Sequence, residues 1–155
     1  MIKAIPKGYR AVTPSFIFKD TRKAMAFYKK AFRAKEILIF PGPDGKSVMH
    51  ATMKIGNSIV MMADENPGMS CKSAETMSGS PISIYLYVKD ADKTFNKAVK
   101  AGAAAVMPVA DMFWGDRMGS VRDPFGYSWT IATHTRELTQ EEIHKGGEEF
   151  FKSMK

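Results

Sequence analysis

Residues 12–32, VTPSFIFKDTRKAMAFYKKAF, and residues 82–102, ISIYLYVKDADKTFNKAVKAG, decide the fold because they follow one plan at an offset of seventy positions. Each stretch alternates polar and apolar side chains like a half-buried strand and then continues with helical periodicity. The same offset relates three pairs of residues: Asp20 and Asp90, Gly45 and Gly115, and Gly56 and Gly126. A supersecondary unit that occurs twice predicts one domain of two similar modules.

The first module is expected at about residues 9–65 and begins with a strand at 12–18. Asp20 is placed to cap a helix that ends near Phe32, because apolar residues recur at helical spacing in between. Three strands should follow, at about 36–40, 47–55 and 58–62. In the strand at 47–55, alternation turns Val48, His50 and Thr52 inward and Met49, Ala51 and Met53 toward the helix.

The second module is expected at about residues 81–135, after a linker at 66–80. Its strands should lie at 82–88, 104–107, 119–123 and 128–132, with a helix between Asp90 and Gly102. Residues 136–155 form a C-terminal helical tail, whose Phe150 and Phe151 we expect to dock on the body or on a second subunit. We therefore predict an α+β domain over residues 1–135. Two βαβββ modules form a curved, mixed, largely antiparallel sheet around a cavity.

Composition and charge narrow the class of protein. The formal net charge is +7, but lysines and arginines are scattered, which excludes a nucleic-acid interface and favours anionic small molecules. No apolar run is long enough for a membrane span, and the first residues lack a secretion signal. The single cysteine, Cys71, fits a reducing compartment. We expect a cytoplasmic protein with no membrane partner.

Strand alternation predicts which side chains line the cavity. Those predicted to face inward include Thr13, Ser15, His50, Ser83, Tyr85, Tyr87 and Arg122. His50 is a candidate hydrogen-bond partner or catalytic base, and equally a structural histidine that bonds across strands. Arg122 needs an anion, either Asp116 or an anionic group of the ligand. Trp114 and Arg117, in a loop flanked by glycine, could close over a ligand, while Trp114 could instead plug the edge of the barrel.

Several motifs in order give the chain a resemblance to a known family. Residues 27–32, FYKKAF, and 123–126, DPFG, within tandem βαβββ units resemble the vicinal oxygen chelate superfamily, which includes glyoxalase I, bleomycin-resistance proteins and extradiol dioxygenases. Residues 113–117, FWGDR, with 123–129, DPFGYSW, and 132–134, ATH, resemble its PhnB-like branch. The resemblance implies a glyoxalase-like fold, a small-molecule ligand and a homodimer.

The resemblance also implies where a metal would bind. Metal-dependent members use a His or Glu from the first and fourth strands of each module, and the matching positions here are Thr13, Val60, Ser83 and Thr130. None of these residues supplies an imidazole nitrogen or a carboxylate oxygen. We therefore expect neither a metal nor another cofactor.

The sequence thus predicts a metal-free small-molecule-binding protein of the glyoxalase and bleomycin-resistance type, with an anionic or aromatic ligand. The alternative is an enzyme: a metal-dependent lyase, isomerase or dioxygenase of the superfamily, or a metal-free catalyst with His50 as base. The predicted ligand-binding residues are Thr13, Ser15, His50, Ser83, Tyr85, Tyr87, Trp114, Arg117, Arg122 and Thr130.

Overall fold

The computed structural model describes residues 2–155 and contains two βαβββ modules, a short connection and a C-terminal helix. The first module consists of β1 (Ser15–Phe18), α1 (Thr21–Phe32), β2 (Lys35–Pro41), β3 (Val48–Ile55) and β4 (Ser58–Asp64). The second consists of β5 (Ser83–Tyr87), α2 (Ala91–Ala101), β6 (Ala104–Asp111), β7 (Asp116–Arg122) and β8 (Ser128–His134). The 3-10 helix η1 (Pro67–Met69) lies in the connection, and α3 (Gln140–Ser153) follows the second module.

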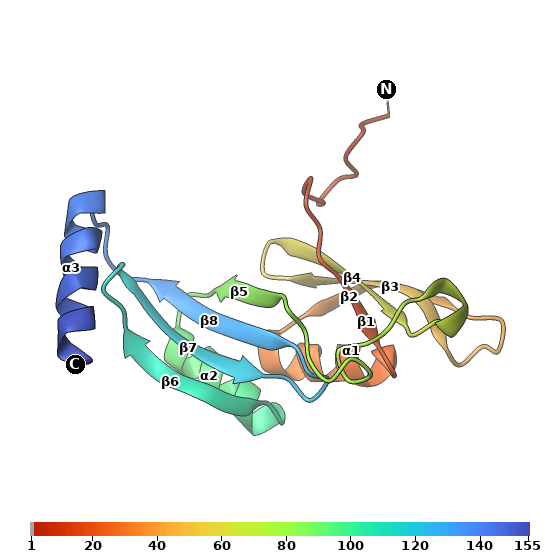
Figure 1. Cartoon of the computed structure of the whole chain (residues 1–155). Helices are drawn as coiled ribbons and strands as arrows, with labels where there is room; N and C mark the ends of the chain where they lie inside the picture. Colours follow the sequence, from red (N-terminus) through yellow and green to blue (C-terminus); the bar gives the residue numbers. More distant parts are fainter. Residues whose placement is uncertain (1) are drawn as a thin grey trace.

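Each module builds its own four-stranded sheet, in the orders β1-β4-β3-β2 and β5-β8-β7-β6. The first strand of each module runs parallel to its fourth, and the other pairs are antiparallel. Figure 1 shows the two sheets side by side, with α1 and α2 beneath them. This arrangement confirms the predicted α+β fold of tandem βαβββ modules.

The two main helices begin as the sequence predicts. The carboxylates of Asp20 and Asp90 accept hydrogen bonds from the backbone N–H groups of Lys23 and Lys93, at 3.1 Å and 2.9 Å. A side-chain acceptor at this position satisfies a backbone donor that the helix itself leaves free. Both helices therefore start directly after the first strand and cover one face of their sheet.

The modules are joined by a shared aromatic core. Trp129 of β8 packs on Tyr28 and Phe32 of α1, with ring centroids 5.3 Å and 4.6 Å away. The Tyr28 hydroxyl donates to the buried Asp123 carboxylate at 2.5 Å, and the Trp129 indole donates to it at 2.9 Å. Burial raises the pKa of Asp123, although these hydrogen bonds oppose the rise. Tyr28 of the first module thus completes the buried hydrogen-bond network around Asp123 of the second module.

The strand register shows that residues seventy positions apart do not always occupy matching places in the two modules. The β3–β4 hairpin pairs Ile55 with Ser58, whereas the β7–β8 hairpin pairs Arg122 with Ser128 and has a longer turn. The connection between β6 and β7, residues 112–115, is also shorter than that between β2 and β3, residues 42–47. The constant offset of seventy therefore fails from β3 and β7 onward. Met61, rather than Val60, is the counterpart of Thr130, because Met61 pairs with Ser15 as Thr130 pairs with Tyr85. Val60 is buried in the core instead.

A second correction concerns the start of β3. Val48 is buried in the core and Met49 is exposed, the reverse of the predicted alternation. The pairing with β2 shifts between Phe40 and Pro41, so one residue is added to the ladder there. Such a bulge changes the face on which the following side chains lie.

The C-terminal helix stands at the end of the second sheet that is far from the first module (Figure 1). It contacts Phe113 through Gly146 and Gly147, and Phe150 packs on the Phe113 ring with centroids 5.7 Å apart. Phe150 therefore docks on the body of the chain, while Phe151 remains largely exposed. No helix of residues 2–155 is both long enough and apolar enough to cross a membrane.

Candidate functional site

The second sheet has one face covered by α2 and one face that we call the open face. Val121, Trp129 and Ile131 point into the core, so the alternate residues of the same strands lie on the open face. Cross-strand pairs on this face join Asp116 with His134, Met118 with Ala132, Ser120 with Thr130, and Arg122 with Ser128. Ser83, Tyr85 and Tyr87 of β5 extend these rows.

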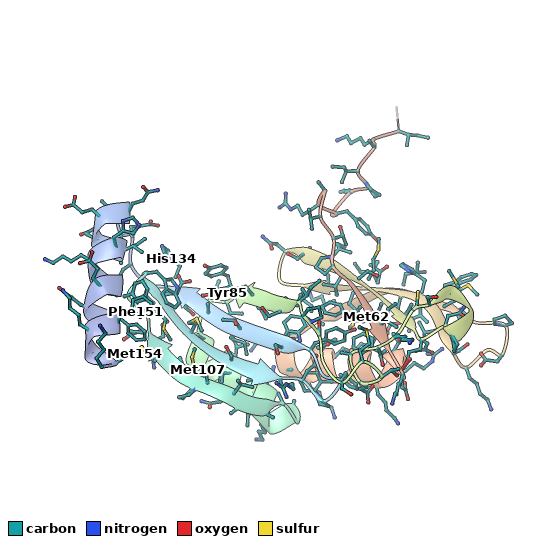
Figure 2. The ribbon with its side chains drawn as sticks, in the orientation of Figure 1. Met62, Tyr85, Met107, His134, Phe151 and Met154 are labelled. Atoms are coloured by element: carbon teal, nitrogen blue, oxygen red, sulfur yellow. The ribbon has the colours of Figure 1, made fainter. Side chains whose placement is uncertain are left out.

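A cluster of polar side chains surrounds Asp116 at one end of the open face. Tyr85 and Tyr87 each donate a hydroxyl hydrogen bond to Asp116 Oδ2 at 2.9 Å. His134 Nδ1 lies 2.8 Å from Asp116 Oδ1 and donates to it. Figure 2 shows Tyr85 and His134 on the same side of the second sheet. We call these four residues the Asp116 cluster.

Charge and burial shift the pKa values of the cluster. Burial alone would raise the pKa of Asp116, which is 3% exposed, but hydrogen bonds from His134, Tyr85 and Tyr87 outweigh it and lower the pKa. Burial and the hydrogen bond to Asp116 raise the pKa of Tyr85 to about 12. The same carboxylate raises the pKa of His134. Asp116 is therefore ionised at neutral pH, and both tyrosines keep their protons.

His134 lies between two carboxylates. Its Nδ1 bonds to buried Asp116, while its Nε2 lies 3.3 Å from Oε1 of Glu137, whose side chain is almost fully exposed. The bond to Asp116 fixes the ring and its tautomer, so Nε2 faces the more open side. A histidine held in this way can bind a ligand through Nε2 or exchange a proton with it.

The chain just before β7 positions Asp116. Gly115 has φ +98, and an added Cβ would collide with the backbone carbonyl of Arg136. The Gly115 carbonyl accepts hydrogen bonds from the backbone N–H groups of Thr135 and Arg136, which follow β8. Only glycine adopts this conformation at so close an approach without strain. The Phe-Trp-Gly-Asp-Arg motif therefore places Asp116 directly opposite His134.

Away from the Asp116 cluster, the open face carries hydroxyl groups near its centre and a cation at its far end. Ser120 and Thr130 share a hydrogen bond of 3.3 Å near its centre. Arg122 is exposed, six residues from Asp116, which corresponds to about 20 Å along a strand. An anionic group of a ligand would meet Arg122, whereas an aromatic group would meet Tyr85 and Tyr87.

The first sheet presents a different open face. Leu38, Phe40 and Met49 are each about half exposed there. His50 Nε2 is 3.1 Å from the Thr52 hydroxyl, and Thr52 is buried. His50 therefore has one local partner and no adjoining carboxylate comparable to Asp116. This face offers a ligand mainly apolar contact.

The structure brings some predicted residues together and separates others. Ser83, Tyr85, Tyr87, Arg122 and Thr130 share the open face of the second sheet, while Ser15 and His50 lie in the first sheet. Thr13 precedes β1, and its hydroxyl donates to the Arg10 carbonyl at 3.0 Å. Trp114 occupies the turn before β7, beside Phe113.

Arg117 is not part of the open face. Its guanidinium bonds Asp92 of α2 through two nitrogens, at 2.6 Å and 2.8 Å, and also reaches Asp111. It therefore lies on the helix-covered side of the sheet, because β7 starts at Asp116 and alternation turns the next residue away. The sequence pattern predicts Arg117 in the loop with Trp114. Trp114 does lie in that turn, but Arg117 belongs to β7.

Asp116 and His134 are site residues that the sequence interpretation did not choose. In the sequence analysis, Asp116 appears only as a partner for Arg122, and His134 only within the motif at residues 132–134. Their pairing in the β7–β8 ladder brings them together. The sequence does contain a signal for Asp116. If the predicted strand is extended back to residue 116, alternation places Asp116 on the same face as Met118, Ser120 and Arg122.

The donors at the positions implied for a metal do not fit a divalent ion. Thr13, Ser83 and Thr130 offer neutral hydroxyls, and Met61, which replaces Val60 by register, offers a thioether. Such donors are poor ligands for the divalent ions that imidazole and carboxylate groups hold. Within residues 2–155, no three His, Cys, Asp or Glu side chains gather closely enough to hold an ion.

Sequence comparison finds close relatives of this chain. A protein of uncharacterised function from Mycobacterium bovis is 40% identical over 136 residues, which cover 86% of this chain and 89% of its own length. A protein of uncharacterised function from Mycobacterium tuberculosis is also 40% identical, with 86% of this chain and 79% of its own length covered.

Solved structures share the fold. TioX from Micromonospora sp. ML1 superposes with a TM-score of 0.63 at 27% identity, over 81% of this chain and 98% of that one. The PhnB protein from Bacillus cereus gives a TM-score of 0.62 at 18% identity, over 80% and 99%. The profile of the Glyoxalase/Bleomycin resistance protein/Dioxygenase superfamily matches residues 12–131. The chain therefore belongs to this superfamily.

Proposed function

We propose that this protein binds a small aromatic molecule on the open face of the second sheet, without a metal ion. The observation that carries the proposal is the Asp116 cluster: a buried carboxylate that holds two exposed tyrosines and one half-exposed histidine. The cluster fixes aromatic and polar groups on one rigid sheet, as a preformed ligand site requires.

The tyrosine pair supplies the aromatic contact. The Tyr85 and Tyr87 ring centroids lie 5.1 Å apart, and the side chains are 44% and 60% exposed. Their hydroxyls are held by Asp116, so the rings lose little further freedom when a ligand stacks on them. A planar aromatic ligand would gain both apolar area and ring contact here.

The sequence predicts either an anionic or an aromatic ligand, and the charges around His134 distinguish between the two. Asp116 and Glu137 place two carboxylates beside His134 and disfavour an anionic group at this end. An anionic group fits only near Arg122, at the other end of the open face. We therefore favour an aromatic ligand, with any anionic substituent directed toward Arg122.

A second copy of the chain would complete the site. Superfamily members often form dimers, and both open faces leave large apolar side chains half exposed, among them Leu38, Phe40 and Tyr87. Large contiguous apolar patches are rare on the surfaces of monomeric proteins. A homodimer that faces these surfaces toward each other would enclose the ligand.

A fragment screen with matched variants tests the proposal. Planar aromatic fragments are screened by thermal shift, and the hits are titrated by calorimetry against wild type, Asp116→Asn and His50→Ala. Loss of the cluster should weaken binding at least about tenfold, the effect of one charged hydrogen bond. His50→Ala should leave the affinity unchanged. Equal affinity of wild type and Asp116→Asn would contradict the proposal.

The geometry also favours one alternative, a metal-free acid–base catalyst that uses His134 rather than His50. Only His134 has a buried carboxylate on one ring nitrogen and an accessible second nitrogen. If a bound fragment is chemically changed over time, His134→Gln should abolish the change while keeping most of the affinity. Loss of affinity without any turnover in the wild type would leave ligand binding as the function.

A further inference from the structure

We propose that a groove between the two modules binds an anionic amphiphile, a single molecule with an apolar chain and a carboxylate or phosphate head. The groove has a volume of about 890 Å³ and lies between the end of α1, the β3–β4 turn, the strand β5 and the start of α2. Ligand pockets of proteins commonly have this size. Tyr87 and His134 of the Asp116 cluster also line the groove, but the inference rests on its apolar and cationic side chains rather than on the cluster.

Apolar side chains from both modules line the groove. Phe32 and Ile55 come from the first module, and Leu86 and Val88 come from the second. Leu86 and Val88 are only partly buried, so they still present apolar surface to the groove. Covering this surface with an alkyl chain would release about 25 cal/mol for each Å² removed from water.

Cations surround this apolar floor. Arg33, Lys89, Lys93 and Lys97 all line the groove and are all exposed. Lys93 and Lys97 lie four residues apart on α2 and therefore share one face of the helix. The one acidic residue that lines the groove is Asp90, whose carboxylate caps the backbone of Lys93. Four cations against one carboxylate favour an anionic head group.

These four cations lack the partners that other cations of the chain have. Lys23, Lys29 and Arg117 pair with nearby carboxylates. No ion pair among residues 2–155 involves Arg33, Lys89, Lys93 or Lys97. A carboxylate or phosphate could therefore bind them without displacing an existing partner.

The backbone of Arg33 gives independent support. Arg33 ends α1 in the left-handed conformation, with φ 55 and ψ 34, whereas the corresponding residue that ends α2 is Gly102. Glycine is the usual residue there, because a side chain makes this conformation costly. An arginine kept in this conformation indicates that its side chain serves a purpose, since strain is concentrated at functional positions. Here the Arg33 side chain lines the groove.

The test uses three probes with one chain length, all below their micelle concentrations: decanoate, decyltrimethylammonium and decanol. Calorimetry on the full chain should detect decanoate at one molecule per groove, with the other two probes at least about tenfold weaker. Equal binding of decyltrimethylammonium, or no binding of decanoate, would overturn the proposal.

Variants locate the binding. Lys93→Glu with Lys97→Glu should weaken decanoate binding at least about tenfold, because it reverses two charges at the rim. Lys100→Glu with Lys145→Glu changes the charge equally at positions that do not line the groove and should have little effect. Arg33→Gly should reduce affinity several-fold without lowering the melting temperature, which separates binding from folding.

Two further results distinguish this proposal from its competitors. The Lys93→Glu/Lys97→Glu variant should bind the aromatic fragments as the wild type does, because neither lysine belongs to the Asp116 cluster. Failure of the aromatic site and failure of the groove are therefore separate outcomes. Sedimentation of the Lys93→Glu/Lys97→Glu variant should match the wild type. A change from dimer to monomer would identify a second copy as the occupant of the groove and overturn the proposal.

Discussion

The two modules use one topology but differ in what their open faces carry. The second sheet holds Asp116, His134 and two tyrosines in a hydrogen-bonded cluster, whereas the first sheet presents Leu38, Phe40 and Met49 with a single histidine. The helix-covered faces of both sheets are apolar and buried. The requirement for a core therefore preserves one face of each module, and the other face is free to change for function.

The largest expected difference between the modules lies in their β-hairpins. Asp123→Ala should destabilise the protein by about 3–5 kcal/mol, because the Tyr28 hydroxyl, the Trp129 indole and two backbone N–H groups would lose a buried acceptor. Asn57→Ala, in the short exposed turn of the first module, should cost less than about 0.5 kcal/mol. Urea unfolding of both variants measures the contrast, and equal losses would show that Asp123 is not the junction we describe.

A smaller difference is expected where the helices meet the sheets. Gly119→Ala should cost about 1–3 kcal/mol, because the new Cβ would lie 2.9 Å from Val109 Cγ2 and 3.0 Å from a Phe95 ring carbon. The register places Ala51 at the corresponding position of the first sheet. Thermal unfolding should detect this loss. An unchanged melting temperature would mean that α2 can move away from its sheet.

The Asp116 cluster predicts how the pKa of His134 responds when its carboxylate partner is removed. Asp116→Asn should lower the pKa of His134 toward its ordinary value of about 6.5, because the hydrogen-bonded carboxylate is the main cause of the rise. NMR titration of the imidazole C–H signals measures the change, and the His50 signal serves as internal control because His50 lies in the other sheet. An unchanged His134 curve would show that Asp116 does not hold this ring.

The smallest expected effect is a pH dependence of stability. Because the pKa of His134 is raised in the folded state, its contribution is fully present below about pH 6.5 and is lost as the pH rises through the folded value. The pKa of Asp116 is lowered, so its contribution is present above about pH 3.9 and is lost as the pH falls through the folded value. His134→Gln should flatten the unfolding curve above pH 6.5, and it should also weaken the acid-side dependence because His134 helps to lower the pKa of Asp116. A flattening on the acid side alone would refute this assignment.

Much of the fold follows from the sequence, because strand alternation, Asp caps and helical periodicity act locally. The helices α1 and α2 lie where these signals predict, and β1 ends where predicted but begins at Ser15 rather than at residue 12. The site is harder to predict because it depends on register. The β6–β7 connection is shorter than the β2–β3 connection and the β7–β8 turn is longer than the β3–β4 turn, so the counterpart of Thr130 is Met61 rather than Val60. A bulge also exposes Met49. Alternation could have placed Asp116 on the open face, but its pairing with His134, eighteen residues away, depends on the register of β7 and β8.

Elemental analysis of the purified protein tests most directly the claim that the Asp116 cluster works without an ion. The protein is measured before and after incubation with Ni²⁺, Zn²⁺, Mn²⁺ and Fe²⁺, followed by desalting. We predict much less than one equivalent of any metal per chain, since Thr13, Met61, Ser83 and Thr130 are poor donors. About one tightly held ion per chain, lost in the His134→Ala or His50→Ala variant, would contradict the account and favour a metal-dependent enzyme.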